Sequence, residues 1–203
     1  MKNIITIQHT QAIHHTTGMV GSWADWDLTQ LGMEQAERIG KRLASELEGA
    51  QYVIYTSDLI RAKRTADTVG AHFNSEPKIY QSLRERNLGK ASGKPKKWAR
   101  ENAIYHENSI DDKPFNGAES RRETWLRLKT FHDEIMAGND ENIIIVSHGD
   151  ALSLFYGIWL GWEVEMLNNF ELTGKAGGVS FLREDSSRKR FIGRLNDLSY
   201  IKE

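Results

Sequence analysis

The chain has 203 residues, of which 39% are hydrophobic and 27% charged, and this composition excludes a disordered, collagen-like or coiled-coil protein. The net charge of -1 gives no overall field that attracts nucleic acid or a membrane surface, so neither is an expected partner. The absence of cysteine excludes disulfides, thiolate metal sites and a cysteine nucleophile, whereas 7 histidines are present. Because the chain has no long apolar stretch and no signal-like start, we expect a cytoplasmic protein.

Short β-branched runs alternate with amphipathic segments along the chain. In order, the pattern predicts a strand at 4–7, a helix at 31–47, a strand at 52–55, a helix at 59–69, a short strand at 78–80, a helix at 124–136 and a strand at 143–146. The runs 179–182 and 191–195 flank a polar stretch and predict a closing hairpin. This alternation is typical of an α/β fold with a mainly parallel sheet.

The segment from Gly93 to Gly117 differs from the rest of the chain. It is polar, has no clear period and contains Pro95 and Pro114. We interpret it as a long loop or lid with a short helix, inserted in one domain that spans residues 1–203.

Polar residues follow the predicted strands at equivalent positions. His9 and His148 each come directly after a buried strand, and Glu85 follows the short third one. Arg61 lies in the first turn of a helix, where the helix N-terminus and a guanidinium together favour an anion. Because ligands of open α/β sheets bind beyond the carboxyl ends of the strands, we expect these four side chains to converge.

The same residues belong to a series of ordered motifs. These are Gln8-His9-Thr10-Gln11, the segment 23–36 with Trp23-Ala24-Asp25-Trp26, Thr56-Ser57-Asp58-Leu59-x-Arg61-Ala62, Leu83-Arg84-Glu85 with Gly89, Gly117-Ala118-Glu119-Ser120 and Val146-Ser147-His148-Gly149. In order and spacing they resemble the histidine phosphatase superfamily, in the branch that contains cofactor-dependent phosphoglycerate mutases and small phosphatases. The resemblance covers nearly the whole chain and implies a three-layer α/β/α sandwich.

The resemblance also implies a reaction, which is metal-independent phosphoryl transfer with no cofactor and a small phosphorylated molecule as partner. His9 would become phosphohistidine, Glu85 would act as general acid and base, and Arg61 and His148 would hold the phosphoryl oxygens. Further substrate contacts are expected from Gln8, Thr10, His15 and Gly149. The lid is short for a mutase, so hydrolysis is the expected outcome.

Three positions depart from the family pattern. Gln8 stands where the family has an arginine, Thr10 where it has a glycine, and His15 where many relatives have a phosphate-binding asparagine. Loss of one charge-assisted hydrogen bond costs about 1.5–3 kcal/mol, or roughly ten- to hundredfold in rate. A protonated His15 would return the charge, and the enzyme would then work best below neutral pH.

Three interpretations of this altered pocket stay open. The first is a working phosphatase, which the retained general acid Glu85 favours, and the second is a weak or inactive protein that binds a phosphorylated ligand. The third is a Zn or Mn site built from His9, His14, His15 and Asp150. It is disfavoured because consecutive histidines on a strand point in opposite directions.

Two further features have alternative interpretations. The basic run from Lys94 to Arg100 is expected to be a solvated lid surface, with substrate steering as the alternative. Trp23 and Trp26 either line the mouth of the pocket or pack the long loop. The sequence predicts neither the substrate nor the oligomeric state.

Overall fold

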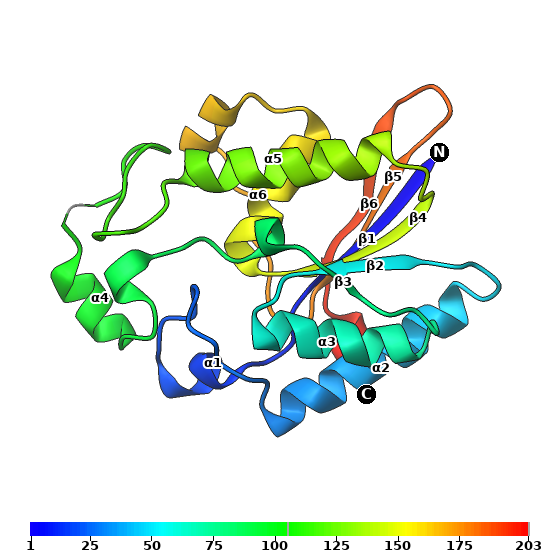
Figure 1. The fold of residues 1–203 in the computed structure, drawn as a ribbon, viewed down its shortest axis with the longest axis horizontal. Helices are drawn as coiled ribbons and strands as arrows, with labels where there is room; N and C mark the ends of the chain where they lie inside the picture. The colour runs from blue at the N-terminus through cyan, green and yellow to red at the C-terminus, as the bar shows by residue number, and fades with distance from the viewer. Residues whose placement is uncertain (105, 203) are drawn as a thin grey trace.

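A six-stranded sheet lies at the centre of the computed structural model, which describes residues 1–104 and 106–202 (Figure 1). The strand order is β3-β2-β4-β1-β5-β6. The strands are β1 (Lys2–Gln8), β2 (Val53–Thr56), β3 (Lys78–Ile79), β4 (Asn142–Ser147), β5 (Val179–Glu184) and β6 (Arg190–Asp197). The first four pair in parallel, whereas β5 runs antiparallel to β1 and β6 antiparallel to β5. The predicted parallel sheet and closing hairpin are therefore confirmed.

The two central strands have apolar side chains on both faces. Ile4 pairs with Ile143 and Ile5 with Ile144, and all four side chains are at most 2% exposed. A strand that is covered on both faces needs a continuous apolar run instead of an alternating one, and that run was the signal in the sequence.

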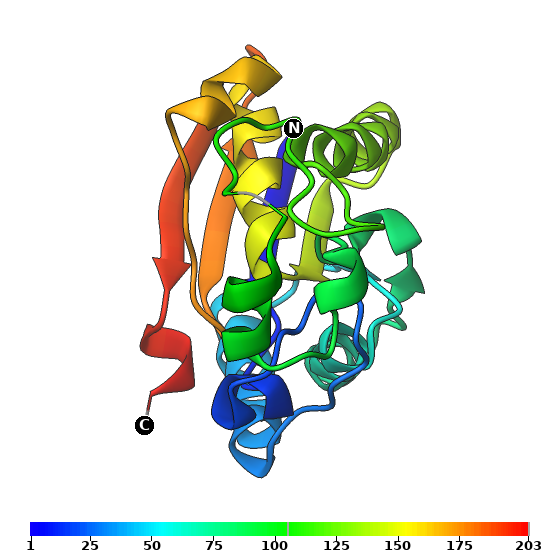
Figure 2. The ribbon, with the colours of Figure 1, turned by 90° about the vertical axis from the view of Figure 1, so that its left-hand side faces the viewer.

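Helices cover both faces of the sheet (Figures 1 and 2). One layer contains α2 (Gln30–Glu46) and α3 (Ile60–Ala71), and the other contains α5 (Arg121–Ala137) and α6 (Gly149–Leu160). Thr29 caps α2 by accepting a hydrogen bond from the Gly32 amide, and Ser120 forms a capping box with Glu123 at the start of α5. This arrangement confirms the expected three-layer sandwich.

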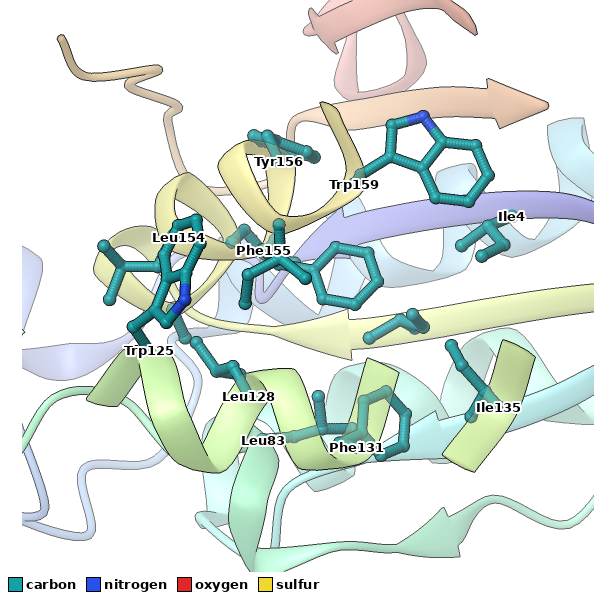
Figure 3. Close-up of a cluster of buried hydrophobic side chains, with 14 of the residues drawn as sticks. Ile4, Leu83, Trp125, Leu128, Phe131, Ile135, Leu154, Phe155, Tyr156 and Trp159 are labelled. Atoms are coloured by element: carbon teal, nitrogen blue, oxygen red, sulfur yellow. The ribbon is translucent and has the colours of Figure 1, made fainter. Parts of the chain in front are cut away.

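The larger hydrophobic cluster lies between the sheet and the layer of α5 and α6 (Figure 3). Trp125 and Phe131 of α5 face Phe155 and Trp159 of α6, with Ile4 of β1 beside them. These contacts fix α6 against the sheet, and they hold its N-terminus at the carboxyl end of β4. None of the helices within residues 1–104 and 106–202 is long and apolar enough to cross a membrane.

The lid segment contains the short helix α4 (Lys96–Asn102), as predicted; residue 105 of this segment lies outside the described part. Apolar residues of the lid, among them Phe115 and Trp98, pack in a small cluster with Ala91 and Ala118, which flank the lid in the sequence. The Lys96 amide donates to the carbonyl of Gly18, which follows α1 (Ile13–Thr17). In Figure 2, α1 and α4 accordingly lie together at one end of the molecule.

Candidate active site

A cavity of about 360 Å³ opens at the carboxyl ends of β1 and β4. Its wall contains six residues that the sequence predicted for the site, namely Gln8, His9, His15, Arg61, Glu85 and Gly149. His14, Arg86, Lys96 and Asp150 also line it. The strand-end argument therefore correctly predicted which segments meet.

A backbone carbonyl determines which ring nitrogen of His9 carries the proton. Its Nδ1 lies 2.9 Å from the carbonyl oxygen of Thr10, which can only accept, so Nδ1 carries the proton. The Nε2 atom therefore carries the lone pair, which accepts a hydrogen bond from Arg61 Nε at 3.2 Å. Burial, and next the charge of Arg61, hold the pKa of His9 well below its usual value. His9 is thus a neutral imidazole with its nucleophilic nitrogen unprotonated.

Arg61 is only 1% exposed and is fixed by main-chain acceptors. Its Nη1 donates to the carbonyl of Ala24 at 2.9 Å, and its Nη2 donates to the carbonyl of Ser22 at 2.7 Å. These contacts orient the guanidinium so that Nε faces His9. The segment between β1 and α2 therefore positions the cation beside the nucleophile.

Glu85 lies at the N-terminus of α6. Its Oε1 accepts hydrogen bonds from the backbone amides of Arg86 at 3.0 Å and Ala151 at 3.1 Å. Burial, and next the neighbouring carboxylate of Asp150, raise the pKa of Glu85 despite these bonds. A carboxyl with a raised pKa keeps its proton closer to neutral pH, which is what a general acid requires.

His148 and Thr10 lie outside the cavity wall. The ring of His148 is edge-on to His9, 5.2 Å between centroids, and its Nε2 is 2.7 Å from Ser57 Oγ. Its buried Nδ1 has no hydrogen-bond partner within the described residues. Thr10 is buried with its hydroxyl 3.3 Å from Thr65 Oγ1, and it does not line the cavity.

His14 and His15 lie on the five-residue helix α1, so the expectation that they point in opposite directions along a strand is wrong. Their ring centroids are 4.0 Å apart, and His15 is stacked on His9 at 5.4 Å. One nitrogen from each of His9, His14 and His15 lies within 4.8 Å of the others. The geometry alone is therefore that of a possible metal site.

The donor set fits a cation poorly. His15 Nδ1 accepts from the Ala12 amide at 3.1 Å, so in the neutral ring Nε2 carries the proton and cannot ligate. Asp150 does not join the cluster, because its carboxylate pairs with Arg86 Nε at 3.2 Å. With Arg61 and Lys96 nearby, the surroundings are positive and favour an anion.

The pKa of His15 moves in the direction opposite to the one that a lower pH optimum requires. Burial, and next the charges of Arg61 and Lys96, lower it. The expectation that a protonated His15 replaces the missing charge of Gln8 is therefore wrong for the unliganded pocket. The neutral ring still presents its Nε2 hydrogen as a donor.

Two cations in the wall were not predicted as site residues. Arg86 is 6% exposed, pairs with both oxygens of Glu107 and also contacts Asp150. Its place directly after Glu85 was the available signal. Lys96 belongs to the basic run interpreted as a solvated lid; it is exposed, as that interpretation expects, and it also lines the cavity.

The two tryptophans of the signature segment are structural. Trp23 Nε1 donates to the carbonyl of Glu85 at 2.6 Å, and Trp26 Nε1 donates to the carbonyl of Val20 at 3.0 Å. Neither lines the cavity. The Trp23 bond instead holds the backbone of the general-acid candidate.

Comparison with known proteins fits this geometry. The family described as "Histidine phosphatase superfamily (branch 1)" matches residues 4–197. The chain belongs to this superfamily. It is 30% identical over 199 residues to a 2,3-bisphosphoglycerate-dependent phosphoglycerate mutase of Sinorhizobium fredii, covering 91% of the chain and 92% of the relative.

Solved structures of this superfamily have the same fold. A mycobacterial glucosyl-3-phosphoglycerate phosphatase superposes with a TM-score of 0.83 at 20% identity, over 97% of this chain and 99% of the other. An alpha-ribazole phosphatase from Shigella flexneri gives 0.82 at 22% identity, over 97% and 96%. The superfamily thus includes both mutases and phosphatases.

Proposed function

We propose that the chain is a metal-independent phosphatase that hydrolyses a small phosphomonoester through a phosphohistidine on His9. The observation that carries the proposal is the complementary pair in one cavity, an unprotonated His9 Nε2 and a Glu85 carboxyl with a raised pKa. A nucleophile and a proton donor in these states are what the first phosphoryl transfer needs.

The reaction has two steps. In the first, the lone pair of His9 Nε2 forms a bond to phosphorus while the bond from phosphorus to the leaving oxygen breaks, and Glu85 transfers its proton to that oxygen. In the second, the Glu85 carboxylate takes a proton from water, the water oxygen bonds to phosphorus and the bond to His9 breaks. Both groups return to their starting protonation states.

Hydrogen-bond donors around His9 stabilise the charge on the phosphoryl oxygens. Arg61 Nε, which donates to His9 Nε2 at 3.2 Å, transfers this bond to a phosphoryl oxygen. His15 Nε2 and the amide of Gln8 donate from the cavity wall, and His148 Nδ1 supplies a further polar contact. The amide of Gly149 lies at the start of α6, where the helix dipole favours an anion.

The test is release of phosphate from an aryl phosphate by wild type, His9→Gln and His72→Gln. His72 is a matched control because it pairs with Glu37 outside the cavity. We expect activity in wild type and His72→Gln and none in His9→Gln. Equal background in all three would contradict the proposal.

A second candidate function is binding of a phosphorylated ligand without turnover, and Gln8 is the observation that favours it. Binding of inorganic phosphate together with equal background hydrolysis in His9→Gln and wild type would support this alternative. Because a related mutase is 30% identical, phosphate exchange on phosphoglycerate is measured in parallel. If phosphate exchange is faster than hydrolysis, the protein is a mutase and the proposed phosphatase function is wrong.

A further inference from the structure

A second cavity, of about 410 Å³, adjoins the candidate active site beneath the lid. Arg86 and Leu88 line both cavities, so the two spaces meet at these side chains. Five of the residues that line the second cavity are apolar, and the other four are Arg86, Arg100, His106 and Glu107. The apolar five are Leu88, Ala99, Ala103, Pro114 and Phe115. The catalytic residues His9 and Glu85 do not reach it.

One face of α4 runs along both cavities. Lys96 lines the first cavity, whereas Ala99, Arg100 and Ala103 line the second. Lys96, Ala99 and Arg100 share one side of α4, because residues spaced by three and four positions lie on the same side of a helix, and Ala103 follows directly after the helix. At 1.5 Å per residue, α4 from Lys96 to Asn102 is about 10 Å long. Helix α4 therefore lies along both cavities, the second of which is the farther from His9.

The chemistry of the second cavity favours an apolar group. Ala99 and Ala103 have small side chains that leave the space open, and Phe115 is held by stacking on Trp98 at 6.4 Å. At the junction, the charge of Arg86 is already balanced by Glu107 and Asp150. This guanidinium is therefore not set up to receive a second anionic group of a substrate.

We propose that the substrate is a phosphomonoester with an elongated apolar leaving group, about 10 Å long, that occupies the second cavity while the phosphoryl group lies at His9. The phosphoryl end of this proposal rests on the proposed function. An alkyl chain and an aromatic group share the required chemistry. The wall contains the aromatic ring of Phe115, and so we expect the aromatic group to bind better.

The test is binding of phosphonates, whose carbon–phosphorus bond cannot transfer the phosphoryl group, measured by titration calorimetry. The probes are methylphosphonate, octylphosphonate and biphenyl-4-ylmethylphosphonate. Both long probes are expected to bind the wild type at least tenfold more tightly than methylphosphonate, with the biphenyl probe the tighter. Affinities within twofold of methylphosphonate, or no binding of any probe, would overturn the proposal.

Two variants that fill the second cavity complete the test. Ala103→Trp and the smaller change Ala99→Leu are expected to remove the preference for long probes and leave methylphosphonate binding within threefold. Lys97→Trp is the matched control, because the Lys97 side chain is 79% exposed and does not line either cavity. A preference that persists in both filled variants contradicts the proposal.

The two proposals fail in distinguishable ways. Tight binding of the long probes without any His9-dependent release of phosphate would support the proposed leaving-group site and refute the proposed phosphatase activity. Release of phosphate that depends on His9, without tighter binding of the long probes, would refute only the proposed leaving-group site.

Discussion

Replacement of Gln8 by arginine is expected to raise activity. The Gln8 side chain lies between two glycines: a Cβ at Gly149 would be 3.3 Å from its Nε2, and a Cβ at Gly174 would be 3.0 Å from its Oε1. Because neither glycine has a side chain, a longer residue at position 8 can extend into the cavity. Gln8→Arg would place a guanidinium beside the phosphoryl oxygens.

The size of the gain follows from the hydrogen bond that is restored. A charge-assisted bond contributes about 1.5–3 kcal/mol, and each 1.36 kcal/mol is tenfold in rate, so kcat/KM should rise about ten- to hundredfold. Repulsion from Arg61 and Lys96, which also line the cavity, places the expected gain toward the lower end of this range.

Steady-state hydrolysis of an aryl phosphate measures this gain, with Gln8→Lys and Gln8→Met as comparisons. Lysine supplies the charge without the planar fork and is expected to give a smaller increase, whereas methionine should lower activity below wild type. If Gln8→Arg is no faster than wild type while its fold is intact, the missing charge is not what limits this pocket.

Three further predictions concern pH and stability. Asp150→Asn removes the carboxylate that helps to raise the pKa of Glu85, so the alkaline limb of the kcat/KM profile should shift to lower pH; an unchanged limb would show that burial alone sets this pKa. Burial lowers the pKa of His14 to about 3, so the unfolded chain, in which this histidine has a pKa of about 6.5, binds a proton more readily than the folded protein. The free energy of unfolding should therefore be highest above pH 6.5 and fall by about 2 kcal/mol by pH 5. Urea unfolding of His14→Gln should show a flatter dependence on pH. Gly32→Ala should cost about 1–3 kcal/mol by the same assay, because its Cβ would lie 2.0 Å from the carbonyl oxygen of Gln11. Gly138→Ala is the control and should change stability by less than about 1 kcal/mol, because its Cβ would make only ordinary contacts, at 3.6 Å, with the carbonyl oxygens of Glu134 and Ile135.

The sheet and its main helices were predictable because their signals are local. Continuous apolar runs identified β1 and β4, and the period of α2 and α3 follows from burial of one face against the sheet. Helix α1 was not predicted, because five residues are too few for a period to emerge. Its His14 and His15 were therefore placed on the wrong kind of element.

The candidate site was predictable only at its strand ends. His9, Arg61 and Glu85 follow elements whose order could be deduced, so their convergence was visible in the sequence. The contacts that set their chemistry could not be deduced in the same way. Arg86 and Glu107, which form an ion pair, are 21 positions apart in the chain. The carbonyl that fixes the proton on His9 belongs to the adjacent Thr10, and its orientation depends on the backbone conformation and not on the residue type.

The most direct test of the account is to trap the covalent intermediate. Wild-type protein is mixed with an aryl phosphate, quenched within the first turnover under conditions that preserve phosphohistidine, and digested for mass spectrometry. The account predicts one phosphoryl group on the peptide that contains His9, and none in His9→Gln. Turnover that depends on His9 without any such phosphopeptide, or with the phosphoryl group on another residue, would contradict the central claim.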